Sequence, residues 1–104
     1  MEHFIVRPML DGSGQPLIEF RGAHRSENFP KILTLLERHL PGFKATGSSP
    51  APDDFLWSCT YASGTFELSD DWGGLFILPR SNHAHVVGDV SVALESSGQF
   101  CRGE

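Results

Sequence analysis

The stretch that decides the fold is FLWSCTYASGTFELSDDWGGLFIL, residues 55–78. Apolar and polar residues alternate over 55–61 and again over 65–69, which is the period of a half-buried β-strand. Residues 75–78 are all apolar, and Gly, Ser and Asp residues that form turns separate the three segments. The stretch therefore predicts three consecutive antiparallel strands. One face of the first strand should carry its large side chains, Phe55, Trp57, Cys59 and Tyr61.

Two further strands are predicted upstream of this meander. Residues 3–10 begin as an apolar, β-branched run, and residues 17–20 form a second short run. The segment between them, 11–16, contains Asp, two Gly and Pro, which favour a turn. We therefore expect a β-hairpin whose loop is longer than two residues.

A helix is predicted between the hairpin and the meander. Its apolar residues recur at the spacing of one helical face: Phe29, Ile32, Leu33, Leu36 and Leu40. Ser26 or Asn28 is expected to cap this helix, with Pro30 in its first turn. Pro41 and Gly42 should end it.

The last segment, residues 83–95, has two interpretations. As a helix it would be capped by Ser81 or Asn82, would end at Gly98, and would have Phe100 folding back on its last turn. One face of that helix would carry Val86, Val87, Val90 and Leu94. The alternative is a hairpin, 83–87 and 90–94, that turns at Gly88 and Asp89. The helix is favoured because the residues before Gly98 are typical of a helix exit and because a second helix covers more of the sheet.

The predicted fold is a single α+β domain over residues 1–104, with the element order ββαβββα. Residues 44–54, rich in Gly, Ser and Pro, are expected to be a long loop. The elements should form two layers, an antiparallel sheet of about five strands with both helices on one face. The other face of the sheet is left to solvent or to a partner.

Charge and composition exclude several classes of function. The formal net charge is −5 and the eight Lys and Arg residues are scattered, which argues against nucleic acid and anionic membrane surfaces as partners. No signal peptide and no run of about 20 apolar residues is present, so a cytoplasmic protein is expected. The two cysteines, Cys59 and Cys101, are expected to be unpaired thiols.

The clearest candidate for a metal site is His83-Ala84-His85. On a strand, side chains two residues apart point the same way, so both imidazoles could bind one zinc or copper ion, with Asp89, His24 or His39 as a third ligand. At the start of a helix the two rings would splay apart. Lone pairs of this kind occur often in proteins without metal, so we expect no metal and no cofactor.

Catalytic patterns are otherwise weak. Asp70 and Asp71 are adjacent carboxylates that could hold a cation, but Asp and Gly are also ordinary turn residues. Cys59 lies in the middle of a strand on its apolar side, where thiols are inert. No nucleophile elbow, phosphate loop or dinucleotide fingerprint is present. An enzymatic role is therefore the less favoured interpretation.

The favoured hypothesis is a small protein-interaction domain, such as an adaptor, an inhibitor or an immunity-type protein. Residues 75–78 are apolar on both faces, which suggests that the second sheet face is used by a protein partner or by a second copy. Acidic side chains of the meander would suit a basic partner. The candidate contact residues are Trp72, Asp70, Asp71, Glu67 and Phe76. The alternative is a small metal-binding or hydrolytic domain using His83 and His85.

Overall fold

The three strands predicted over residues 55–78 are present as β4 (Asp54–Tyr61), β5 (Gly64–Asp71) and β6 (Gly74–Pro79) in a computed structural model of the chain. The structure describes residues 2–9, 12–22, 26–51, 54–71 and 74–103. Each strand of the meander pairs antiparallel with the next. The alternation predicted from the sequence is confirmed, because the side chains on one face are buried: Cys59, Tyr61, Phe66, Leu68, Leu75 and Ile77.

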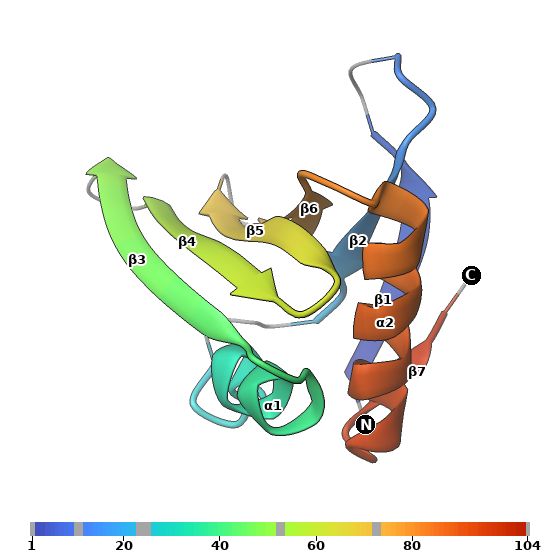
Figure 1. Ribbon diagram of the computed structural model, residues 1–104. Coiled ribbons are helices and arrows are strands. Elements are labelled where there is room, and N and C mark those ends of the chain that lie inside the picture. The colour runs from blue at the N-terminus through green and yellow to red at the C-terminus, as the bar shows by residue number, and fades with distance from the viewer. Residues whose placement is uncertain (1, 10–11, 23–25, 52–53, 72–73, 104) are drawn as a thin grey trace.

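The predicted hairpin is also present, as β1 (Glu2–Pro8) and β2 (Pro16–Phe20). β2 pairs antiparallel with β6, with Ile18 opposite Ile77, so the hairpin and the meander form one continuous sheet. The order of strands across the sheet is β3-β4-β5-β6-β2-β1-β7, and the sheet curls around the helices (Figure 1). Among the described strands, only the pair β1 and β7 is parallel.

The expectation of about five strands in the order ββαβββα is wrong, because the described residues form seven strands in the order ββαββββαβ. The predicted loop at 44–54 is largely an edge strand, β3 (Lys44–Ala51), which pairs with β4. Its Gly, Ser and Pro residues have low β-propensity, but β4 offers a full row of backbone partners that overrides this preference. The seventh strand, β7 (Phe100–Arg102), pairs with β1, a contact between the two ends of the chain that local pattern does not reveal.

The first helix, α1 (Ile32–His39), begins later than predicted. Lys31 occupies the capping position, and Ser26 is instead part of a separate turn, in which its hydroxyl accepts a hydrogen bond from the Asn28 N–H at 3.3 Å. That turn uses the polar groups that were expected to cap the helix. The buried face contains Ile32, Leu35 and Leu36.

The second helix, α2 (His83–Ser96), confirms the helical interpretation of residues 83–95. The four predicted core residues, Val86, Val87, Val90 and Leu94, are all buried. Asn82 occupies the capping position but makes no side-chain cap bond; its amide donates to the Ser63 carbonyl at 2.7 Å. Gly98 follows the helix with a φ of 75°, a left-handed conformation that glycine adopts without strain.

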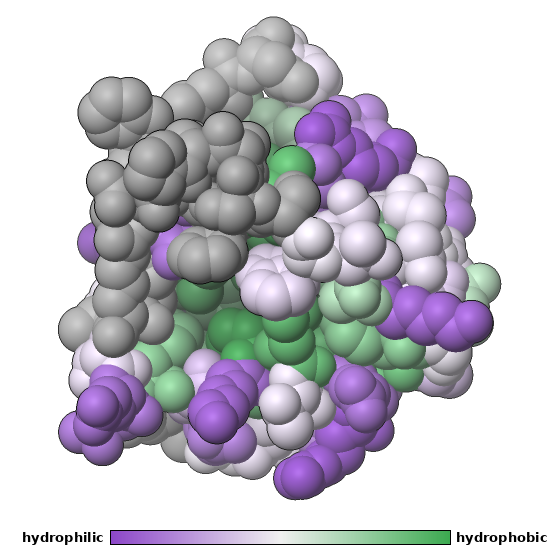
Figure 2. Space-filling view, turned by 90° about the vertical axis from the view of Figure 1, so that its left-hand side faces the viewer, coloured by the Kyte–Doolittle hydropathy of each residue, from purple (hydrophilic) through white to green (hydrophobic). Residues whose placement is uncertain are grey.

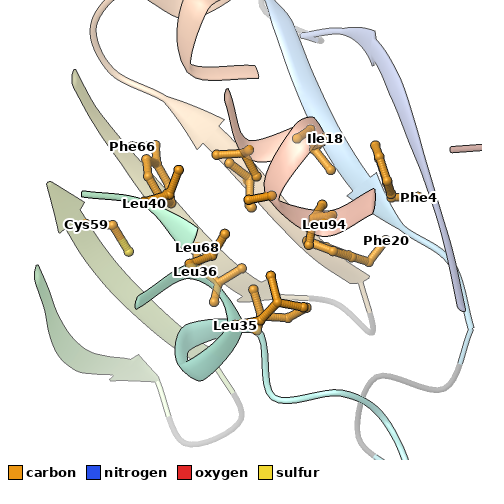
Figure 3. Close-up of a cluster of buried hydrophobic side chains, with 14 of the residues drawn as sticks. Phe4, Ile18, Phe20, Leu35, Leu36, Leu40, Cys59, Phe66, Leu68 and Leu94 are labelled. Atoms are coloured by element: carbon orange, nitrogen blue, oxygen red, sulfur yellow. The ribbon is translucent and has the colours of Figure 1, made fainter. Parts of the chain in front are cut away.

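Both helices lie on the same face of the sheet, as Figure 1 shows. Leu36 and Leu40 of the α1 region pack toward Cys59, Phe66 and Leu68 of the meander (Figure 3). Leu94 of α2 lies near Ile18, Phe4 and Phe20 of the hairpin in the same view. One hydrophobic cluster thus joins the sheet to both helices, and the opposite face of the sheet has no helix of the described chain over it. Neither α1 nor α2 has the length and hydropathy needed to span a bilayer.

Candidate functional site

The sheet face turned away from the helices, called here the outer face, is defined by strand alternation and register. Residues opposite each other in an antiparallel pair point to the same side of the sheet. Because Phe4, Ile18 and Ile77 are buried against the helices, their neighbours along each strand point outward. On the strands β1, β2, β5 and β6 the outer-face side chains are Ile5, Arg7, Leu17, Glu19, Glu67, Ser69, Phe76 and Leu78.

Apolar and charged side chains alternate across this face. Ile5 of β1 lies opposite Glu19 of β2, and Glu19 lies opposite Phe76 of β6. Arg7 of β1 lies opposite Leu17 of β2. Leu78 of β6 lies opposite Glu67 of β5. Leu17 is only 4% exposed although no helix covers it, so its neighbours in the sheet must shield it. We call Ile5, Leu17, Phe76 and Leu78 the apolar strip.

Ion pairs surround the apolar strip. Arg7 Nε donates to Glu19 Oε1 at 2.6 Å, and its guanidinium carbon lies 5.8 Å from the centroid of the Phe76 ring, a cation–π contact. Arg21 Nη1 is 3.7 Å from the second oxygen of Glu19. Arg80 pairs with Glu67. Glu19 and Glu67 are therefore each held by at least one arginine.

The arginines of these pairs are more exposed than the carboxylates. The side chains of Arg21 and Arg80 are 58% and 63% exposed, whereas those of Glu19 and Glu67 are 23% and 15% exposed. Lys44, opposite Thr60 at the β3 edge, adds another exposed cation on the same side. Among the outer-face residues whose side chains the structure describes, four are cationic and two are carboxylates. The arginine side chains described on this face are thus more exposed than the carboxylates they bind, although the chain as a whole carries −5.

The predicted contact residues do not all share this face. Glu67 of β5 and Phe76 of β6 lie on it, on neighbouring strands, where Glu67 is opposite Leu78 and Phe76 is opposite Ser69. Asp70 lies opposite Leu75, which is buried on the helix side, so Asp70 points to the other face. The side chain of Asp71 and all of Trp72 lie outside the described residues. Glu67 and Asp70 therefore do not build the acidic surface that the sequence suggested.

The histidine pair lies in the first turn of α2. Residues two apart on a helix point in different directions, so His83 and His85 do not share a ligand position. His85 Nε2 is instead 3.2 Å from Asp89 Oδ2, one helical turn away. Within the described part of the chain, no three His, Cys, Asp or Glu side chains gather closely enough to hold a metal ion.

Asp89 also receives a hydrogen bond from the sheet. The Tyr61 hydroxyl donates to Asp89 Oδ2 at 2.6 Å, which ties β4 to α2. Burial of the phenol, and then its bond to Asp89, raise the pKa of Tyr61 well above its ordinary value. Tyr61 is thus a proton donor to a fixed carboxylate, and the contact stabilises the packing of helix on sheet.

Cys59 has the properties of a core residue. Its side chain is 1% exposed, and burial raises the pKa of its thiol from 9.0 to about 12. A thiol in that state is a poor nucleophile at neutral pH. Cys59 and Cys101 are both free thiols.

A hydrophobic cavity of about 440 Å³ lies between the start of α1 and the strands β5 and β6. Its apolar lining comes from Phe29, Pro30, Leu33, Leu68 and Leu75. In the lower half of the molecule, where α1 lies, Figure 2 shows hydrophobic side chains gathered above a hydrophilic edge. The cavity offers apolar surface, and polar groups of Ser26, Glu27, Lys31 and Thr34 also line it.

Arg7, Arg21 and Arg80 were not predicted to share the outer face, because the basic residues are scattered along the sequence. A signal was present. Arg21 stands two residues after Glu19, and Arg80 stands two residues after Leu78, so strand alternation alone puts each pair on one face.

Comparison with known proteins does not assign this chain. No protein-family model, no curated protein sequence and no solved structure matches it.

Proposed function

We propose that the protein is a protein-interaction domain and that the outer face of its sheet is the binding surface. The observation that carries the proposal is the apolar strip on a sheet face that neither helix covers, with arginines more exposed than their carboxylate partners around it. Protein interfaces commonly have an apolar centre, a polar rim, and arginine and aromatic residues as the main contributors to affinity.

The charge of the outer face favours an acidic partner. Exposed Arg21, Arg80 and Lys44 would attract carboxylates and speed the encounter. This differs from the basic partner that the net charge of −5 suggested, because Glu19 and Glu67 are already held by arginines. A second copy docked face to face would oppose like charges, so a different protein is the proposed occupant.

The biological class stays that of an adaptor, an inhibitor or an immunity-type protein, acting in the cytoplasm. Two unpaired thiols support a reducing compartment. The alternative metal-binding or hydrolytic role receives no support from the described geometry, since His83 and His85 diverge and the thiol of Cys59 is buried.

Affinity capture from the source lysate, followed by a binding assay with the purified partner, tests this proposal. Wild-type protein is compared with Phe76→Ser, which removes the ring from the apolar strip, and with Arg21→Glu, which reverses an exposed rim charge. The control is Arg102→Glu, an equal charge change on an exposed residue of β7 that is not on the outer face.

We expect a partner with acidic surface whose affinity falls as salt rises and drops at least tenfold with Arg21→Glu, about 1.4 kcal/mol. The Arg102→Glu control should bind like the wild type. Methyl NMR signals of Ile5, Leu17 and Leu78 should shift on complex formation. Equal binding by all variants, or NMR shifts confined to the helices, would overturn the proposal. A dimer in solution without any partner would overturn it in favour of self-association.

A further inference from the structure

A second surface, on the helix side of the molecule, has the composition of an anion site. α1 and the chain that follows α2 enclose a cleft of about 170 Å³. The side chains and backbone that line it belong to Lys31, Thr34, Leu35, Arg38, His39, Ser97 and Gln99. A volume of this size equals that of roughly five or six water molecules, enough for a small tetrahedral anion with part of its hydration shell.

The charge lining the cleft is positive. Lys31 contributes an ammonium group, Arg38 a guanidinium and His39 an imidazole, and the part of the lining that the structure describes contains no carboxylate. Within the described chain, Lys31 and Arg38 take part in no ion pair. Two unpaired cations therefore face one cleft in a protein whose net charge is −5.

Helix stability explains only part of this cluster. Arg38 and His39 lie in the last turn of α1, where positive charge interacts favourably with the helix dipole. Lys31 lies at the opposite end, in the capping position, where a cation is unfavourable and where the helix has no side-chain cap and no acidic residue in its first turn. The spacing of three, seven and eight residues from Lys31 to Thr34, Arg38 and His39 places all four on one side of the helix.

The other wall of the cleft is held in place by short-range hydrogen bonds. The Ser97 hydroxyl donates to the Leu94 carbonyl at 2.6 Å and accepts from the Gln99 N–H at 3.1 Å. These bonds fix the turn that brings Gln99 to the cleft. The side-chain amide of Gln99 and the Thr34 hydroxyl can therefore donate to a ligand without a change of backbone. The cleft is therefore organised before any ligand arrives.

We propose that this cleft binds a phosphate group. A lysine ammonium, an arginine guanidinium and neutral N–H and O–H donors are the groups that recognise phosphate oxygens. The site is separate from the outer face, because it lies in the helix layer on the other side of the sheet (Figure 1). It would take the phosphate of a small metabolite or of a phosphorylated side chain, since both present the same dianion.

NMR titration of the full chain with inorganic phosphate tests the proposal. We expect saturable shifts of the backbone amides of Thr34, Arg38 and Gln99, with affinity at least tenfold weaker in Lys31→Gln and Arg38→Gln. Arg21→Gln, an equal charge loss on the outer face, is the matched control and should bind phosphate like the wild type. Unchanged melting temperatures of the variants would show that the loss is not a folding defect.

Two further titrations identify the ligand. Sodium acetate at the same ionic strength should bind more weakly than phosphate. Ribose 5-phosphate and a phosphoserine tripeptide distinguish the sources, because the natural one should bind more tightly than inorganic phosphate. Non-saturating shifts spread over the whole surface, equal binding of acetate, or wild-type affinity in both Lys31→Gln and Arg38→Gln would overturn the proposal.

Discussion

At the scale of single residues, the edge of the sheet depends on one glycine. Gly47 of β3 lies directly opposite Trp57 of β4, and the indole ring lies where a side chain at Gly47 would point. A Cβ atom at Gly47 would lie less than 3.0 Å from three ring carbons of Trp57. Glycine is needed here for a close approach, and the tryptophan ring supplies the contacts that glycine lacks.

Gly47→Ala should therefore destabilise the protein. The new methyl group must displace a ring that packs against the core, and overpacking of this kind costs about 1–3 kcal/mol of unfolding free energy. Urea unfolding followed by circular dichroism measures this loss, and tryptophan fluorescence should report the displaced ring. Unchanged stability would mean that the ring can move away without cost.

Ser91 of α2 is a buried polar residue whose hydroxyl group is not satisfied by a hydrogen bond in the described structure. Its residue is 6% exposed, and its hydroxyl has no hydrogen-bond partner in the described structure. A buried hydroxyl that gives up water and gains no partner lowers stability.

Ser91→Ala should stabilise the protein by about 1 kcal/mol, because it removes the unsatisfied hydroxyl and improves helix propensity. Urea unfolding provides the measurement, and Ser97→Ala is the control. The Ser97 hydroxyl is bonded on both sides, so that variant should lose stability instead. A loss of stability in Ser91→Ala would reveal a bond to the Ser91 hydroxyl in solution.

At the scale of elements, α2 carries most of the helix packing but contains one weak position. Gly88 lies in the middle of the helix and is exposed, and a Cβ atom there would meet nothing within 4 Å. Glycine in a helix interior costs conformational entropy without any packing need at this site.

Gly88→Ala should raise the free energy of unfolding by about 1 kcal/mol. A glycine-to-alanine substitution should thus lower the free energy of unfolding at Gly47 and raise it at Gly88. Each variant serves as the control for the other. Thermal unfolding of both variants beside the wild type would test this. A destabilised Gly88→Ala would mean that the helix is bent or contacted at this point in solution.

Elements differed in how well local pattern predicted them. The meander was predicted because its two-residue period repeats over several turns of alternation. For residues 83–95 the pattern left a helix and a hairpin open, and the helix exit before Gly98 favoured the helix that is present as α2. Local pattern predicts a loop where β3 lies, because Gly47 and its Ser and Pro neighbours have low β-propensity. β7 is three residues long and pairs with the other end of the chain, so no local signal marks it.

At the scale of the whole molecule, exposed arginines gather on the outer face of an acidic protein. The outer face shows exposed arginines, while the chain as a whole is acidic. Scattered positions in the sequence, such as Arg7, Arg21 and Arg80, meet on one surface only because β1, β2 and β6 are neighbours in the sheet. The candidate binding surface is therefore a property of the assembled sheet.

Global stability should fall in alkali. The pKa of the Cys59 thiol is raised from 9.0 to about 12 by burial, and that of the Tyr61 phenol is raised in the same direction. In the unfolded chain the thiol ionises earlier, so the unfolded state binds fewer protons above about pH 9 and the free energy of unfolding decreases with pH. The stabilising effect of the protonated core is complete below pH 9 and is lost as the pH rises toward 12.

Urea unfolding at several pH values between about 8 and 11 measures this decline. Cys59→Val, which keeps an apolar side chain of similar size in the core, should show a shallower decline than the wild type. Identical pH dependence in the two proteins would show that Cys59 does not contribute.

The sequence by itself determined the faces of the local elements: which side chains of the meander point together, and that Ile32 and Leu36 lie on one side of a helix. Periodicity is a property of neighbouring residues, so no distant contact is needed to read it. Only the tertiary structure decided that β6 pairs with β2, that β7 returns to β1, and that both helices cover one face. Those choices depend on contacts between residues far apart in the chain, and they place the outer-face arginines together and bring Gln99 beside Lys31 and Arg38.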